Sequence, residues 1–560
     1  MACVSCRKQK RKCNKALPAC ALCERMNRHC DYSDASPAPT SEEFNALSMK
    51  VIELESRLNG NHSMISPPTT YRTPSSTAIS APDSLGAGGP SYNHPQDYAW
   101  QGLQNKFPAI AVLDKETFKD GGYGYLISQY QGYLKYPYIA FAAKDVLEHL
   151  GDGNSVTAIA NEYFATVHLW MPIVSQKRLM VDMRNPHWEA GPDFALLLLC
   201  MKLIISRPPD SIESYQTLIY VSAKRFIAMA EASGTVSLFV LQAGLLITWY
   251  EYGQAIYPAA WMSAGWCVRY GNLLGINGHS ETLELLGRPS TWTELEERRR
   301  TWWGVLITDK IVSIGSQGHI LTNQEPNADT PLPVNDSAWE QGELSLAVQR
   351  LVSNPLSDAV EPFPRLCQAS ILVGKVLNHH HGTPIPSDVL KFGLANQLYI
   401  EISILARKLN EEAENTQDFL SLTAPLSLTY STLCVLCEEY SCPAGSITSS
   451  PEAAEMQIKA IDGLKTVAGS IVAFADRISL ATQNPQDLDR LSPIIMECMY
   501  TAAANYAWLV RESGDESYQI ALDSLRHCLR KFGTRWRNAA EYLRILEAKE
   551  FTYAVGSAAS

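Results

Sequence analysis

The sequence predicts an all-α protein in which a small, cysteine-rich N-terminal module precedes a large helical body. Six cysteines recur at regular spacing within the first thirty residues. From about residue 123 onward, long segments with apolar residues at helical spacing alternate with short polar breaks, and valine-rich strand alternation is scarce. A hydrophobic content of 46% over 560 residues supports a substantial core and about two to four domains.

The cysteines form two halves with the same spacing, Cys-x2-Cys-x6-Cys, offset by 17 residues: Cys3, Cys6 and Cys13, then Cys20, Cys23 and Cys30. Two thiolates separated by two residues suit one corner of a tetrahedral zinc site, because a short loop brings both sulfurs within ~2.3 Å of one ion. Six thiolates are too few for two independent four-coordinate sites, so two of them must bridge. The repeat requires the bridging pair to occupy equivalent positions in the two halves.

A disulfide framework and a redox pair are the alternatives to a metal cluster at these cysteines. A disulfide framework would be expected behind a signal peptide, and Met1 and Ala2 leave no room for one ahead of Cys3. A redox Cys-x-x-Cys pair would not explain six cysteines in register. The spacing therefore favours a metal cluster.

Charge is distributed unevenly along the chain. Residues 1–33 carry a net charge of +6, and because the whole chain carries −11, the remainder carries −17. Between the second and third cysteines lies a basic run that only Gln9 interrupts: Arg7, Lys8, Lys10, Arg11 and Lys12. A basic module on an acidic body is typical of a protein that binds a polyanion through the module alone. The same run fits a nuclear import signal, although such runs are common.

The remaining sequence indicates a soluble intracellular protein without a membrane partner. The other eight cysteines are scattered through apolar segments, as in proteins of a reducing compartment. The longest apolar run, 194–205, is interrupted by Lys202 and is too short to cross a membrane.

Residues 33–60 are predicted to hold a linker and a short coiled-coil dimerisation helix. Residues 31–43 are polar and contain prolines. Five apolar residues then recur at spacings of 3 and 4, as at positions a and d of a coiled coil: Phe44, Leu47, Val51, Leu54 and Leu58. The alternative is an ordinary short amphipathic helix. Residues 61–120, rich in Ser, Thr, Pro and Gly, are predicted to be disordered.

In the body, apolar periodicity predicts helices over 192–206, 236–251, 260–274, 294–314, 388–408, 453–477, 491–511, 516–531 and 535–550. Thr293 and Glu296 are spaced as a capping box for the helix at 294–314. Asp309 falls among apolar residues of that helix, and an arginine from 298–300 is its expected partner. Cys434 and Cys437 are predicted to be core residues, and the histidines at 379–381 to end a helix.

The N-terminal stretch resembles the fungal zinc binuclear cluster (Zn2Cys6) transcription factors, with all six cysteines present and with Pro18 where the family has its loop proline. The resemblance implies two zinc ions per chain, with Cys3 and Cys20 as the bridging ligands. Residues 1–32 would be the DNA-binding domain. By resemblance, Lys10 reads the guanines of a CGG-like triplet. Gln9 is also expected at the DNA surface, where the family commonly has a basic residue. The remaining cations would contact phosphates: Arg7, Lys8, Arg11, Lys12 and Lys15.

The helical body resembles the middle homology region of the same regulators. The matching pieces are Tyr163-Phe164 with His168, Ala260-Trp261-Met262 with Gly265, and Glu297-Arg298-Arg299-Arg300 with Trp302-Trp303, closed by Pro331-Leu332-Pro333. The resemblance implies that 121–335 is this region and that 336–560 is the C-terminal helical part of the same regulatory domain. It implies dimerisation, and it allows a small-molecule effector or a coregulator as a partner of the body.

We therefore expect a nuclear, homodimeric, zinc-dependent regulator that binds double-stranded DNA, with control of a biosynthetic gene cluster as its suggested role. No nucleophile elbow, Walker loop, dinucleotide fingerprint or His-Glu-x-x-His motif is present, so an enzyme is not expected. The alternative is a helical metabolite-binding protein or enzyme that uses the zinc cluster to bind other proteins. The basic run disfavours this alternative, because phosphates need such cations and a protein partner does not.

Overall fold

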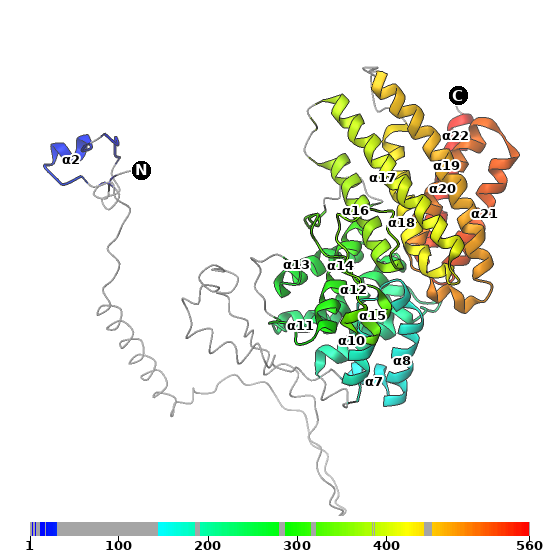
Figure 1. Cartoon of the computed structure of the whole chain (residues 1–560), viewed down its shortest axis with the longest axis horizontal. Coiled ribbons are helices and arrows are strands. Elements are labelled where there is room, and N and C mark those ends of the chain that lie inside the picture. The colour runs from blue at the N-terminus through cyan, green and yellow to red at the C-terminus, as the bar shows by residue number, and fades with distance from the viewer. Residues whose placement is uncertain are drawn as a thin grey trace, which may run out of the picture. The chain divides into compact units, whose positions relative to one another are not determined.

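The computed structural model describes Cys3, Cys6, 12–16, 18–30, 144–184, 191–278, 286–314, 321–382, 385, 387–441 and 451–558. The chain divides into two compact units, Met1–Ser91 and Tyr92–Ser560. Within the described residues every regular element is a helix, and the one β-bridge joins Pro331 and Leu351 (Figure 1). The predicted all-α class is confirmed. The predicted coiled coil at 44–58 and the predicted disordered segment at 61–120 lie outside the described residues.

The first half of the body is built from α7 (Lys144–Leu150), α8 (Gly153–Ala165), α9 (Gln176–Asp182), α10 (Pro192–Ile205), α11 (Leu218–Ala232), α12 (Leu238–Gly253), α13 (Ala259–Leu274), α14 (Trp292–Ile314) and α15 (Asp336–Gln341). Helix α12 is the centre of this half, because every residue from Val240 to Gly253 is buried. It is covered by α10, α11, α13 and α14. A helix covered on all sides carries no polar stripe. The polar side chains of α12, among them Gln242 and Glu251, are buried singly and form hydrogen bonds.

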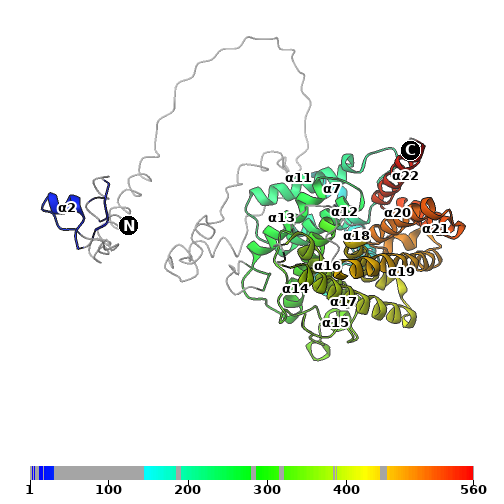
Figure 2. The same cartoon turned by 90° about the horizontal axis from the view of Figure 1, so that it is seen from above.

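The second half contains α16 (Pro362–His381), α17 (Asp388–Asn415), α18 (Thr423–Ser441), α19 (Pro451–Ala481), α20 (Ile495–Ser513), α21 (Glu516–Gly533) and α22 (Arg537–Ala558). Helix α18 packs against α16, α17, α19 and α20, and both views place it among them (Figure 1, Figure 2). The nine predicted helices are all present, with ends that differ from the predicted ends by a few residues except at α17 and α22, which extend further. Cys434 and Cys437 are buried in α18, and His381 ends α16, as predicted.

Two helices in the described part of the chain have the length and hydropathy of a membrane span: Val389–Asn415, which is 28% buried, and Phe419–Ser441, which is 89% buried. Neither holds a long uninterrupted apolar run, because polar residues are spaced through both. Burial explains the composition of the second helix, which is α18, the core helix. It does not explain the composition of α17.

Helix α14, which carries one of the sequence pieces of the family resemblance, is joined by hydrogen bonds to distant parts of the chain. Glu297 on α14 is buried and accepts hydrogen bonds from the backbone N–H of Ser175 (2.9 Å) and from Gln242 Nε2 (3.1 Å). Trp303, two turns further along, donates from Nε1 to the carbonyl of Pro331 (3.0 Å). Residues far apart in the sequence are thus joined by hydrogen bonds to one helix.

Two predictions about α14 were wrong. Thr291, not Thr293, caps the helix by accepting the N–H of Glu294 (3.2 Å), and Glu294 in turn accepts the N–H of Ser290 (2.9 Å). The sequence contains two Thr-x-x-Glu frames two residues apart. Glu296 is buried and accepts hydrogen bonds from Arg300 Nε (3.2 Å) and from the backbone N–H of residue 334 (2.8 Å), so it is not available as the capping glutamate.

The predicted arginine partner of Asp309 is the second error. Asp309 accepts hydrogen bonds from the backbone N–H (3.1 Å) and hydroxyl (2.6 Å) of Thr322, and burial raises the pKa of its carboxyl group. Arg298 pairs with Glu294 instead, on its own helix. The arginines lie two to three helical turns before Asp309, about 14 Å along the axis, which is too far for a direct pair.

The two halves of the body share one apolar core that runs from Val146 to Leu546. Helix α14 of the first half packs against α16 of the second. A second contact between the halves is made by Trp536, which precedes α22. Its ring lies over Gly253 at the end of α12, where an added Cβ would lie 2.3 Å from a ring carbon, and its Nε1 donates to the carbonyl of Leu491 (3.1 Å). Only glycine allows the ring to approach the helix this closely.

Gly253→Ala is therefore expected to destabilise the whole body by about 1–3 kcal/mol, because the methyl group overpacks a rigid ring. The free energy of unfolding, from denaturant titration followed by circular dichroism, measures this. Gly265→Ala on α13 is the matched control, since its Cβ would meet no atom within 4 Å. It should be neutral or stabilising. Equal effects of the two substitutions would contradict the close contact.

Candidate metal centre and nucleic-acid interface

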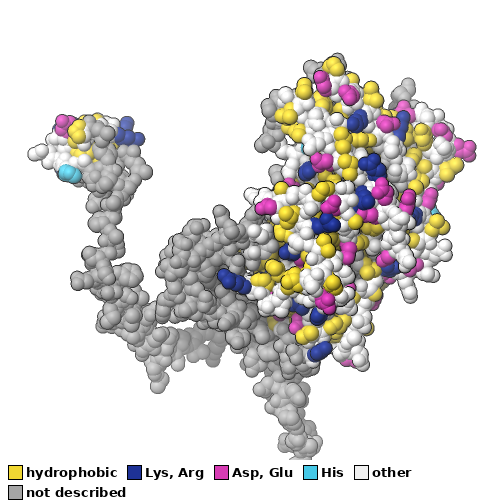
Figure 3. Space-filling view, viewed as in Figure 1, with side chains coloured by type: hydrophobic (Ala, Val, Ile, Leu, Met, Phe, Trp, Pro, Cys, Tyr) yellow, Lys and Arg dark blue, Asp and Glu magenta, His cyan; other side chains and the backbone are white. Residues whose placement is uncertain are grey.

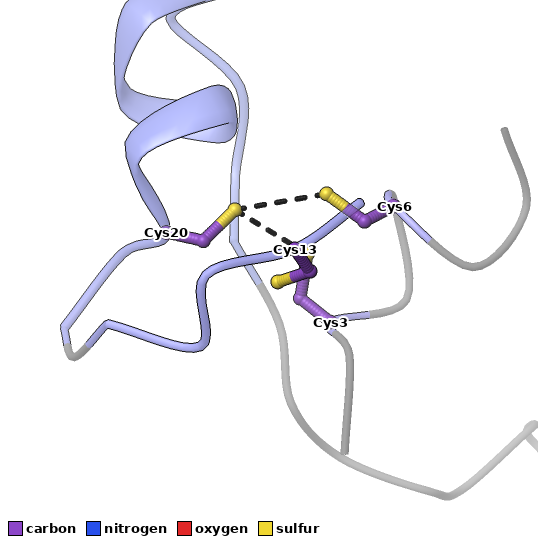
Figure 4. Close-up of side chains that lie close together, drawn as sticks. All are labelled: Cys3, Cys6, Cys13 and Cys20. Atoms are coloured by element: carbon purple, nitrogen blue, oxygen red, sulfur yellow. Dashed lines mark hydrogen bonds between the residues drawn. The ribbon is translucent and has the colours of Figure 1, made fainter. Parts of the chain in front are cut away.

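The six cysteine sulfurs gather in two overlapping groups of four. One group contains Cys3, Cys6, Cys13 and Cys20, and the other contains Cys3, Cys20, Cys23 and Cys30. Within each group the Sγ atoms all lie within 4.8 Å of one another, and Figure 4 shows the first group. Among the described residues these are the groups of three or more potential ligands that could hold a metal ion. Cys3 and Cys20 belong to both groups and occupy equivalent positions in the repeat.

The separations between sulfurs fit zinc. In a tetrahedron with Zn–S bonds of ~2.3 Å, two sulfurs lie ~3.8 Å apart. The Sγ atoms of Cys3 and Cys20 are 3.8 Å apart, those of Cys3 and Cys23 3.6 Å, and those of Cys6 and Cys20 3.7 Å. Four thiolates around each of two centres, with the shared pair between them, are the donor set that two zinc ions require.

Cys20 has a second role, as the N-cap of the short helix α2 (Ala21–Arg25). Its Sγ accepts the backbone N–H of Cys23 (3.4 Å), and this hydrogen bond lowers the pKa of the Cys20 thiol to about 6. Its own N–H donates to Cys30 Sγ (3.2 Å). The hydrogen bond from Cys23 places a positive amide dipole on the Cys20 sulfur, which favours the thiolate that a metal needs.

Asn14 is a structural residue of this module that the sequence reasoning missed. Its Oδ1 accepts the backbone N–H of Ala21 (3.0 Å), so the segment after Cys13 is joined to the start of α2 in the second half. Lys15 follows with a φ of 62°, in the left-handed region that asparagine and glycine adopt more readily. An asparagine directly after a ligand cysteine and before a proline-containing loop was the available signal.

Of the seven residues predicted to contact DNA, the structure describes two, Lys12 and Lys15, and both side chains are exposed. The other five lie outside the described residues: Arg7, Lys8, Gln9, Lys10 and Arg11. The dimerisation residues also lie outside them: Phe44, Leu47, Val51, Leu54 and Leu58. These assignments stay predictions.

Two family models match the chain. Residues 1–39 match the fungal Zn(2)-Cys(6) binuclear cluster domain, and residues 160–424 match the fungal specific transcription factor domain. The first match covers the six cysteines, and the second covers most of the first half of the body with α16 and α17.

The curated relatives are fungal transcription factors. Transcription factor BOA15 of Botryotinia fuckeliana is 37% identical over 171 residues, which are 30% of this chain and 91% of that protein. The pigment biosynthesis transcriptional activator pigB of Monascus ruber is 27% identical over 39% of this chain and 41% of its own length. The citrinin biosynthesis transcriptional activator mrl3 of Monascus ruber is 23% identical over 68% of this chain and 72% of its own length.

The sulfur geometry, the two domain matches in sequence order and these relatives agree. Zinc is the cofactor, and the family domain holds two ions. DNA is the partner that such a domain implies. The chain belongs to the fungal Zn2Cys6 transcription factors.

Proposed function

We propose that the chain is a sequence-specific, zinc-dependent regulator of genes transcribed by RNA polymerase II, and that it acts in the nucleus as a homodimer. The observation that carries the proposal is the pair of four-sulfur groups sharing Cys3 and Cys20, in a module of charge +6 (residues 1–33) while the rest of the chain carries −17. Zinc holds the module folded, because its few apolar residues cannot form a core. The acidic body repels DNA, so binding falls to the module.

The basic loop between Cys6 and Cys13 is the proposed DNA-contacting surface. Lys10 would donate to the O6 and N7 acceptors of guanine in the major groove. Arg7, Lys8, Arg11, Lys12 and Lys15 would contact phosphates. Exposure of Lys12 and Lys15 supports this role. Because a module of this size reads about one triplet, two modules are needed for a useful specificity, and residues 44–58 would join them.

The names of the relatives support a biosynthetic role. Two of them are named as activators of pigment and of citrinin biosynthesis. We propose that this chain likewise activates a cluster of biosynthetic genes. Transcript profiling of a deletion strain, together with genome-wide binding, tests this: loss of expression across one contiguous gene cluster is expected, and unchanged expression of all clusters would contradict it.

Lys10→Ala tests the assignment of base contacts. The full-length variant should lose about 1–3 kcal/mol of binding to a DNA duplex with paired CGG triplets and much less to the same duplex with the triplets scrambled. Lys15→Ala is the matched control. It should weaken binding to both duplexes equally, and it should reduce the slope of log affinity against log salt concentration by about one, as expected for the loss of one phosphate contact. Fluorescence anisotropy at several salt concentrations measures both.

Equal loss on the two duplexes for Lys10→Ala would make Lys10 a phosphate contact. Wild-type binding that does not weaken between low and moderate salt would contradict DNA binding through the basic module and favour a protein-binding zinc cluster.

A further inference from the structure

The chain enters the described part of the body beside helix α11. The first described residue of the body is Lys144, and the next residue, Asp145, accepts a hydrogen bond from the hydroxyl of Ser222 on α11 (2.6 Å). Arg225, one turn further along α11, forms an ion pair with the same carboxylate. Figure 2 shows α7 next to α11. The segment that ends at residue 143 is therefore tethered at the first turns of α11.

The outer side of α11 is apolar. Exposed residues recur along it at spacings of three and four, as on one side of a helix: Leu218, Val221, Arg225, Ala228 and Ala232. Arg225 is the only charged residue among these five, and it is paired with Asp145. Leu218 is 76% exposed and Val221 48%. Both apolar side chains thus lie within about one helical turn of Ser222, where the chain enters the body.

Helix α13 lies next to α11 and continues this surface. Lys224 Nζ donates to Ser263 Oγ on α13 (3.0 Å), and Trp266 Nε1 donates to Glu231 on α11 (3.1 Å). Met262, which precedes Ser263, is 61% exposed. Figure 3 shows hydrophobic side chains on the part of the body where Figure 1 places α11 and α13. Exposed apolar groups on adjacent helices are typical of an interaction site, and methionine adapts its shape to a partner. We define the α11 face as Leu218, Val221 and Met262.

The segment that precedes α7 is aromatic and nearly uncharged. Residues 123–141 contain seven aromatic side chains: Tyr123, Tyr125, Tyr130, Tyr133, Tyr136, Tyr138 and Phe141. Lys135 is the only charged residue of the segment, whereas 19% of the whole chain is charged and 9% is aromatic. These residues lie outside the described part of the structure. Their composition favours packing against an apolar surface, and tyrosine can do so while its hydroxyl stays in water.

We propose that residues 123–141 dock on the α11 face of the same chain. Phe141 is four residues before Asp145, so an extended backbone lets it reach at most about 14 Å from there. Leu218 lies about one helical turn from Ser222, or roughly 5.4 Å along the axis. A tether this short gives the segment an effective concentration on the order of millimolar, so weak contacts suffice. A separate protein or a second copy would have to compete with it.

Docking has a consequence for the connection to the zinc module. With the segment docked, residues 31–122 connect the module to the body, whereas without docking residues 31–143 do so. The contact involves neither zinc nor DNA, so it can fail while the proposed function holds, and the reverse.

Limited trypsin digestion of the full-length protein tests the docking. Lys135 is the only lysine or arginine between Lys119 and Lys144, so cleavage inside the segment gives one new N-terminus, at Tyr136. Mass spectrometry quantifies the appearance of this N-terminus with time. Because proteolysis follows the population of the released form, the rate of cleavage after Lys135 reports how much of the segment is undocked.

Leu218→Asp together with Val221→Asp should accelerate this cleavage about tenfold or more, because two carboxylates in the α11 face expel the segment and proteolysis follows the released form. Both positions are at the start of α11, where the helix dipole favours acidic side chains, so the helix should remain folded. Leu344→Asp together with Val348→Asp is the matched control, since these residues are 62% and 55% exposed and lie outside the α11 face. It adds the same charge and should leave the rate unchanged.

A second variant leaves the sequence of the described body unchanged. Tyr130→Ser together with Phe141→Ser removes two aromatic side chains from the segment and should also accelerate cleavage after Lys135. Thermal unfolding midpoints, followed by circular dichroism, should be the same for all variants and show that each is folded.

Equal cleavage rates in the wild type and in either the α11 variant or the segment variant would overturn the proposal, whether the rates are fast or slow. If the control accelerates cleavage as much as the α11 variant does, added charge is the cause and the α11 face is not the docking site. Protection that weakens on dilution of the wild type would assign the contact to a second copy, because docking within one chain is independent of concentration. That result would equally overturn the proposal.

Discussion

Cys20→Ser should remove both zinc ions from the chain and abolish specific DNA binding. Its sulfur lies in both four-sulfur groups, so its loss leaves each group with three thiolates, while the serine hydroxyl can still cap α2. The folding energy of such a module comes from ligation, on the order of 10–16 kcal/mol for a structural zinc. Elemental analysis of the purified full-length protein should give two zinc ions for the wild type and none for the variant.

Cys13→Ser is the matched control, because Cys13 belongs to one group only. It should lower the zinc content mainly by one ion. The helicity of the body, followed by circular dichroism, should be unchanged in both variants. This measurement distinguishes unfolding of the zinc module from unfolding of the whole protein. One zinc ion per wild-type chain with all cysteines reduced would contradict the bridged cluster, and so would equal zinc losses in Cys20→Ser and Cys13→Ser.

Leu47→Gln together with Leu54→Gln should weaken binding to a paired-triplet site by about 10²- to 10⁴-fold. When two modules are joined, binding of the first holds the second at a high effective concentration near its triplet, and the double variant loses this advantage. Both residues occupy position d of the predicted coiled coil. The experiment is done in the full-length protein. Zinc content and the weak binding to a single triplet should not change.

Met49→Gln together with Ser56→Gln is the control for the coiled coil. These residues occupy position f, which faces away from the partner helix, and the double variant should bind paired triplets as tightly as its parent. If the Leu47 and Leu54 variant binds paired triplets equally tightly, the two modules are not joined through residues 44–58.

The metal centre could be predicted from the sequence because coordination is a local constraint. The spacing from Cys3 to Cys30 limits which sulfurs can surround one ion, and the structure gathers the sulfurs in groups that share Cys3 and Cys20. The helices could be predicted because apolar residues recur at helical spacing on the side that faces the core. Helix α12 is informative in another way: with no polar stripe it has no readable face, and only its length and apolar content indicated a buried helix.

The rest depended on tertiary packing. The capping frame of α14 was misassigned because the choice between Thr291 and Thr293 depends on the burial of Glu296 against residue 334, 38 positions away. Asn14 was missed because its partner, Ala21, is defined by the folded module.

The contact between Trp536 and Gly253 has a consequence for genetics. A premature stop codon upstream of residue 536 removes the Trp536 ring, which packs against Gly253 at the end of α12. Its loss exposes the core of the first half to water. Such alleles should behave as null alleles through degradation of the entire polypeptide, even when the zinc module and the matched regions are translated in full. A stop codon just after α22 should leave a working protein, so the border between harmless and null truncations falls between these two positions.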